Sequence, residues 1–287
     1  MSPTIQITLS MVIFGTIGIF RRWIPLPSSF VAMSRGAIGA AFLLIVLLLR
    51  GKRLDFKAIR KRLPLLCLTG AMLGANWILL FEAYNYTSVA TATLCYYFAP
   101  MFIILASPAL LHERLTPKKL ICVAAAVLGM VFVSGVLETG MQNVSELKGV
   151  LLGLAAAVLY AGIVLFNKKT TGVSGTDRTV VQLAVSSVTL LPYVLLTENV
   201  AVMEFAPATV VLLIFVGIVH TGLAYQLYFS SIPHISAQTA AILSYIDPVL
   251  AVILSALLLH EHMSVLSIVG AVLVIGAALV SELPERK

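Results

Sequence analysis

The chain has 287 residues, of which 60% are hydrophobic and 11% are charged, and its formal net charge is +7 at pH 7. Soluble domains carry about 25% charged residues, so this composition excludes an ordinary soluble fold. The basic residues are not gathered on a separate soluble domain, which argues against nucleic acid as a partner.

Apolar segments long enough to span a bilayer recur along the whole chain. About 20 apolar residues cross the hydrocarbon core. We expect ten such segments, at residues 5–22, 30–49, 64–84, 88–111, 118–137, 147–167, 178–197, 208–230, 236–259 and 264–282. The first ends in Arg21 and Arg22 and not in a small-residue cleavage site, so we expect a retained helix and not a signal peptide. The predicted fold class is an all-α integral membrane protein with ten transmembrane helices.

The connections between these segments are short and carry no recognisable cofactor motif. No GxxxxGK[ST] phosphate loop occurs, so a gradient would have to drive any uphill movement. The three cysteines, Cys67, Cys95 and Cys122, lie far apart in apolar segments. No spacing typical of metal ligands appears. We expect no cofactor and no metal.

The Lys and Arg residues predict the orientation in the membrane. Fifteen of them fall on one set of alternating loops and at the C-terminus, whereas the other set holds three, namely Arg21, Arg22 and Lys148; Arg35 lies inside the second segment. Cytoplasmic loops carry an excess of Lys and Arg. We therefore expect a multi-pass protein of the plasma membrane with both termini in the cytoplasm. In a cell that has both an inner and an outer membrane, this is the inner membrane.

The two halves of the chain are related by an internal repeat. Residues 88–113 align with residues 236–261, with ten of 26 positions identical, and Pro100 matches Pro248 while Tyr97 matches Tyr245. Because each half has five segments, the second half enters the membrane upside down. An inverted repeat is typical of secondary transporters and predicts a site at the midplane between the halves. We divide the chain at residues 1–143 and 144–287, and one chain that supplies both halves favours a monomer.

The chain resembles the ten-helix EamA-type members of the drug/metabolite transporter superfamily. The likeness rests on the two halves, the basic loops, an Arg early in the second segment (MSRGAIGAAFLL), and proline-centred fourth and ninth segments that each end in a glutamate (LLHERLT and LLHEHMS). It covers nearly the whole chain. The resemblance implies a central cavity walled mainly by helices 1, 3, 4, 6, 8 and 9, and export of amino acids or other small metabolites, with sugars or drugs as substrates of some members.

Two ionisable side chains lie deep in the predicted membrane. Asp247 lies about eleven residues into its segment, near the bilayer centre, where a charge costs at least about 2.5 kcal/mol. The adjoining Pro248 frees a carbonyl one turn earlier. These features favour binding of a proton or a substrate amine; the alternative is a protonated carboxyl that packs against a neighbouring helix. His220 lies at similar depth and could relay a proton, or be a neutral imidazole that donates one interhelical hydrogen bond.

Deep aromatic and amide side chains are candidates for a cavity wall. They are Asn76, Trp77, Tyr97, Tyr160, Tyr225 and Tyr245. Apolar faces with a few polar tips suit small amphipathic solutes. Many membrane tyrosines only form interfacial belts, but Trp77, Tyr97 and Tyr245 lie too deep for that. Pro100 and Pro248 break the fourth and ninth helices, whose halves would rock to expose a solute alternately.

Four further charged positions lie near segment ends. Arg35 could snorkel to the nearby surface or pair with Glu82, and the family resemblance adds a functional or gating role. Glu82 itself could be a water-exposed rim residue. Glu113 and Glu261 end the fourth and ninth segments, where a carboxylate opposes the helix dipole. We expect these two to be structural, with Arg114 or Lys118 beside Glu113.

The sequence thus predicts a secondary transporter and not an enzyme, with a small metabolite and membrane lipid as its partners. Proton-coupled export through Asp247 is the main hypothesis, and an uncoupled facilitator or exchanger is the alternative. An intramembrane enzyme would need a motif such as GxSxG or GxGD, and neither occurs. The inverted repeat argues against a non-transporting scaffold.

Overall fold

The computed structural model describes residues 1–87, 89–133, 137, 144–259 and 264–282. The first half contains α1 (Pro3–Arg22), α2 (Ser28–Leu49), α3 (Phe56–Ala83), α4 (Val89–Tyr96), α5 (Ala99–Leu111) and α6 (Pro117–Val133). The second half contains α8 (Val144–Lys169), α9 (Gly175–Thr197), η1 (Val200–Val202), α10 (Pro207–Phe215), η2 (Val216–Leu223), α11 (Ala224–Ser231), η3 (Ile232–His234), α12 (Ala237–Leu243), α13 (Ile246–Leu259) and α14 (Val265–Glu282).

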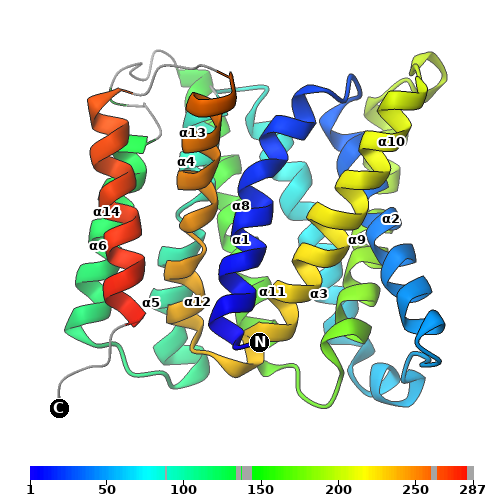
Figure 1. The fold of residues 1–287 in the computed structure, drawn as a ribbon, viewed down its shortest axis with the longest axis horizontal. Coiled ribbons are helices and arrows are strands. Elements are labelled where there is room, and N and C mark those ends of the chain that lie inside the picture. Colours follow the sequence, from blue (N-terminus) through cyan, green and yellow to red (C-terminus); the bar gives the residue numbers. More distant parts are fainter. Residues whose placement is uncertain (88, 134–136, 138–143, 260–263, 283–287) are drawn as a thin grey trace.

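The prediction of an all-α membrane fold is confirmed, because every regular element in the described part of the chain is a helix and the long helices run side by side (Figure 1). By length and composition, seven of the described helical stretches could each cross a membrane. The other three expected spans correspond to α6, to α12 with α13, and to α14. Residue 143, at the expected boundary between the halves, lies outside the described residues, so that division stays a prediction.

Proline positions explain two of the breaks between helices. The fourth span consists of α4 and α5, and Pro100 lies in the first turn of α5. The ninth span consists of α12 and α13, and Pro248 lies in the first turn of α13. Proline has no N–H to donate, so a first helical turn accepts it without losing an intrahelical bond. The eighth span changes from α-helix to π-helix in η2, between α10 and α11.

Glycines let helices of the two halves approach closely. A Cβ atom on Gly70 would lie 2.9 Å from the carbonyl oxygen of Gln182, and one on Gly74 would lie 2.8 Å from that of Ser186. Both acceptors belong to α9, so this GxxxG pair allows α3 to pack directly on α9. On the outside of the bundle, large apolar side chains such as Leu151 and Val188 are more than half exposed. An apolar outer surface is what contact with lipid tails requires.

Candidate substrate cavity

A cavity of about 510 Å³ lies between the two halves of the protein. Its wall is built by α1 to α5 and α8, together with η2, α11 and α13. On α1 the lining runs from Met11 to Arg21, and it continues through Ile24 in the α1–α2 connection to Ser28 at the start of α2. The cavity therefore reaches the end of the bundle opposite the N-terminus (Figure 1). Small-molecule pockets measure about 300–1,000 Å³, so the volume suits a small metabolite.

Asp247 lines the cavity, and within the described residues its carboxyl group has neither a hydrogen bond nor an ion pair. A close approach of α1 holds its backbone, because a Cβ atom on Gly15 would lie 2.8 Å from the Asp247 carbonyl oxygen. The half-buried side chain is thus carried on the first turn of α13 beside the helix break. A carboxyl group that lacks a protein partner inside a membrane cavity is free to bind a solute or a proton.

Arg35 of α2 is the second charged group of the wall. Its guanidinium carbon lies 4.6 Å from the centroid of the Trp77 ring, a cation–π arrangement. Its buried Nε has no hydrogen-bond partner within the described structure, and no carboxylate lies within 4.0 Å. The pairing with Glu82 that the sequence allowed is not made, since Glu82 accepts a hydrogen bond from the Tyr193 hydroxyl at 2.5 Å. Arg35 therefore presents an unpaired positive charge to the cavity.

Arg21 also lines the cavity, but its guanidinium is occupied. It donates to the carbonyl oxygens of Ile24 at 2.6 Å and Leu26 at 2.7 Å, and to the Ser28 hydroxyl at 3.0 Å. Three hydrogen bonds to one short segment fix the α1–α2 connection at the rim. The sequence places Arg21 only among the three basic residues of the second set of loops, and no residue near it in the sequence indicates this role.

Aromatic rings form most of the remaining wall. Trp77, Tyr97, Tyr160 and Tyr225 all line the cavity, as does Tyr96. The ring centroid of Tyr96 lies 5.9 Å from that of Tyr97 and 5.8 Å from that of Tyr160. The ring centroids of Trp77 and Tyr225 are 6.1 Å apart. These separations are those of favourable edge and tilted pairs. The rings thus give the wall aromatic faces on which an apolar or aromatic part of a solute can lie.

Some residues proposed from the sequence do not line the cavity. They are Asn76, Glu82, His220, Tyr245 and Pro248. Asn76 is fully buried and donates from Nδ2 to the carbonyl oxygen of Ala156 at 2.6 Å, so it joins α3 to α8. Tyr245 is fully buried, and its hydroxyl has no partner in the described structure. Of the two helix-breaking prolines, Pro100 lines the cavity and Pro248 does not.

His220 lies in the π-helical segment η2 and contacts α1. Its Nε2 is 2.8 Å from the Thr16 hydroxyl, which itself donates to the carbonyl oxygen of Ile13 at 2.7 Å. A hydroxyl has one proton to give, so the imidazole Nε2 donates this interhelical bond. The ring packs between Phe20 and Phe215, at centroid distances of 5.0 and 5.7 Å. This geometry fits the neutral, structural alternative for His220.

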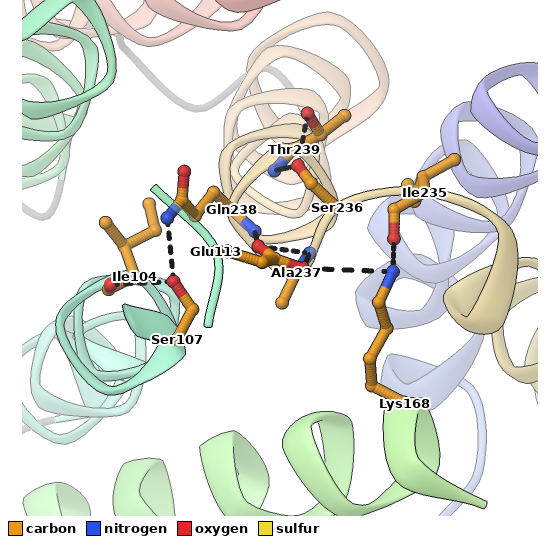
Figure 2. A network of polar contacts seen from close by, with 9 residues as sticks. All are labelled: Ile104, Ser107, Glu113, Lys168, Ile235, Ser236, Ala237, Gln238 and Thr239. Atoms are coloured by element: carbon orange, nitrogen blue, oxygen red, sulfur yellow. Dashed lines mark hydrogen bonds and ion pairs between the residues drawn. The ribbon is translucent and has the colours of Figure 1, made fainter. Parts of the chain in front are cut away.

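A polar network joins the halves at the end of the bundle that holds the N-terminus. Glu113 accepts hydrogen bonds from the Ala237 amide, at 2.9 and 3.1 Å to its two oxygens, and lies 3.8 Å from the Lys168 ammonium (Figure 2). Lys168 also donates to the carbonyl oxygen of Ile235. Gln238 donates to Ser107 at 2.8 Å. Glu113 thus caps α12 from across the repeat boundary and holds three spans together.

The expectation that Glu113 is structural, with Arg114 or Lys118 beside it, omitted these contacts. Lys168 lies 55 residues further along the chain, so local sequence carries no signal for the pair. His112 adopts φ 56° at the end of α5, and this left-handed turn carries the chain out of the helix just before Glu113. Glu261, the counterpart in the second half, lies outside the described residues.

Comparisons with known proteins agree with this architecture. The model of the EamA-like transporter family matches the chain twice, over residues 1–135 and 147–282. The uncharacterized transporter YxxF of Bacillus subtilis (strain 168) is 27% identical over 255 residues, which are 88% of this chain and 80% of that protein. An uncharacterized transporter of Archaeoglobus fulgidus is 25% identical over 197 residues, 68% of this chain and 67% of its own length.

One solved structure, a crystal structure of another protein, superposes on the chain with a TM-score of 0.88. The two sequences are 20% identical, and the match covers 98% of this chain and 96% of the other. At that identity the likeness shows the fold alone.

Proposed function

The chain belongs to the EamA-like transporter family, and on that premise we propose that this multi-pass membrane protein is a secondary transporter of small metabolites that works by alternating access. The observation that carries the proposal is the cavity of about 510 Å³ between the halves, with two unpaired charges in an aromatic wall. A family of transporters does not favour the intramembrane enzyme that the sequence left open. One chain carries both halves, so we propose a monomer with both termini in the cytoplasm.

The wall favours a solute that carries both a carboxylate and an amine. Arg35 offers a guanidinium, which binds carboxylates through two parallel hydrogen bonds. Asp247 offers the complementary charge for an amine, and the rings around Trp77 offer apolar contact. We therefore propose amino acids or related metabolites as substrates, with export as the direction that the family resemblance suggests.

The polar network supports the alternating-access part of the proposal. The cavity extends to the end of the bundle opposite the N-terminus, while Glu113 bonds α12 and α8 together at the other end. Opening that other end would require Glu113 to release the N-terminus of α12. The breaks at Pro100 and Pro248 would allow the inner halves of the fourth and ninth spans to move apart from the outer halves.

Coupling to protons is the finer part of the proposal, and Asp247 would carry it. It is the one carboxylate among the described residues that line the cavity. Binding a proton there would remove the charge that an incoming amine needs, so proton and substrate would compete for one site. The alternative is an uncoupled exchanger in which Asp247 only recognises the amine.

Uptake by proteoliposomes tests both versions. Vesicles are preloaded with a panel of amino acids, and accumulation is measured with and without a pH gradient for wild type, Asp247→Asn and Glu82→Gln. The last variant removes a carboxylate that does not line the cavity. Coupling through Asp247 predicts that gradient-driven accumulation is lost in Asp247→Asn and persists in Glu82→Gln. Exchange without a gradient should also weaken in Asp247→Asn, because Asn offers no charge to the amine, and should survive in Glu82→Gln. Transport that ignores the gradient in wild type would support the exchanger, and absence of transport across the panel would contradict the proposed substrates.

A further inference from the structure

The first two turns of α3 extend beyond the expected membrane span. The apolar segment was expected from residue 64, but the helix begins at Phe56. Asp55 makes this possible, because its carboxylate accepts a hydrogen bond from the Ala58 amide at 2.9 Å and caps the helix. The extension continues a basic stretch that starts at the end of α2. Its cations are Arg50, Lys52, Arg53, Lys57, Arg60, Lys61 and Arg62.

The two faces of this helical extension differ. At about 100° per residue, Phe56, Lys57, Arg60 and Lys61 fall within one arc of about 140°. These four residues line a hollow of about 460 Å³ on the surface. The opposite arc carries Ile59, which is buried in a small apolar cluster with Leu66 and Val173.

Arg62 also belongs to the packed arc. It donates to the Thr171 hydroxyl at 3.4 Å, so its guanidinium is directed toward the α8–α9 connection and away from the hollow. One face of this helical extension is therefore packed against the rest of the protein, and the other face is exposed at the surface. Arg62 differs from its neighbours in orientation while carrying the same charge, and this makes it a matched control.

The charges of the exposed face are not neutralised by the protein. None of the seven cations lies within 4.0 Å of a carboxylate of the described residues, and Asp55, the one acid within the stretch, is engaged as a helix cap. Beside them Phe56 is 72% exposed and Leu49 is 82% exposed. A soluble anion would use the cations alone. A lipid headgroup at the edge of the hydrocarbon core would use both the cations and the apolar side chains.

We propose that the hollow formed by Phe56, Lys57, Arg60 and Lys61 binds the phosphate headgroup of an anionic phospholipid. The three cations contact the phosphate, and Phe56 enters the boundary between headgroups and acyl chains. The same helix carries Trp77 in the cavity wall, about 20 residues further on. An anionic lipid bound at the start of α3 thus holds the helix that supports the substrate cavity.

Lipid titration of the purified full-length protein tests this site. Phosphatidylglycerol or phosphatidylcholine is added to the protein in neutral detergent, and bound lipid is counted by native mass spectrometry. The variants are Lys57→Gln/Arg60→Gln/Lys61→Gln and the control Arg62→Gln. Basic residues near a membrane surface act additively on anionic lipid, so we expect phosphatidylglycerol binding to weaken at least about tenfold in the triple variant. Arg62→Gln should stay within about twofold of wild type, and Arg60→Lys should keep the binding.

Several results would overturn the assignment. The triple variant could bind phosphatidylglycerol as wild type does, Arg62→Gln could weaken binding as much as the triple variant, or phosphatidylcholine could bind equally well. Displacement of the lipid by excess inorganic phosphate would assign the hollow to a free anion. If the triple variant does not yield a monodisperse protein, the single variants Arg60→Gln and Arg62→Gln provide the same comparison. Because the readout is lipid binding, failure here leaves the transport proposal untouched.

Discussion

Replacing Glu113 by Gln should loosen the closed end of the bundle without removing a bulky side chain. The Ala237 N–H donates a hydrogen bond that is shared between the two oxygens of the carboxylate, and the carboxylate pairs with Lys168 at 3.8 Å. The Glu113 and Lys168 side chains are 16% and 19% exposed. A hydrogen bond to a charged group contributes about 1.5–3 kcal/mol. Glutamine keeps one acceptor oxygen but loses the charge. We therefore expect the closed state to lose about 1.5–3 kcal/mol, a factor of about 10–150 in the opening equilibrium.

Cysteine accessibility measures this opening. Ala240 of α12 is fully buried, close to the network. In a chain without its native cysteines, Ala240→Cys should react with a membrane-impermeant maleimide faster when Glu113→Gln is also present. Glu204→Gln removes the same charge from an exposed position and should leave the rate unchanged. Equal labelling with and without Glu113→Gln, together with a lower unfolding temperature, would refute the gating role and leave Glu113 as a helix cap.

Three further predictions concern the cavity and α1. Arg35→Gln should raise the apparent KM for an amino acid by about tenfold or more, since a charged hydrogen bond is lost, and should change uptake of the corresponding methyl ester little; equal effects on both would argue against carboxylate binding. Gly15→Val should lower the unfolding temperature and abolish uptake, because its Cβ atom would lie 2.8 Å from the Asp247 carbonyl oxygen; a normal unfolding temperature would contradict the close packing. His220→Gln can still donate to Thr16 and should keep uptake within about threefold of wild type, whereas His220→Leu should destabilise by about 1–3 kcal/mol in chemical unfolding. Loss of pH-driven uptake in His220→Gln alone would indicate a proton relay.

The sequence was informative about the spans and weak about which face of each span is turned inward. Hydropathy predicted the spans and prolines predicted two helix breaks, because both are local properties. The sequence does not distinguish Trp77, which lines the cavity, from Tyr245, which is buried elsewhere in the protein. Lipid tails and protein interiors are equally apolar, so an apolar helix carries little periodicity that identifies its inner face.

Other misses have different physical causes. The π-helical segment η2 arises where α2 and the eighth span meet, and its local sequence, VGIVHTGL, gives no sign of it. The role of Arg21 depends on carbonyls that the chain presents only after it turns. The early start of α3, in contrast, could have been predicted, since Asp55 followed by helix-forming residues is a capping signal.

The central claim is that the solute passes through the cavity, and blocking the cavity tests it most directly. Gly18 lines the cavity, and a Cβ atom added there meets nothing within 4 Å, so we expect the side chain of Gly18→Trp to enter the cavity and occupy it. Gly276 of α14 is equally open but does not line the cavity, which makes Gly276→Trp the matched control. Solute exchange should be lost in Gly18→Trp and retained in Gly276→Trp. Exchange by Gly18→Trp at the wild-type rate would contradict the account.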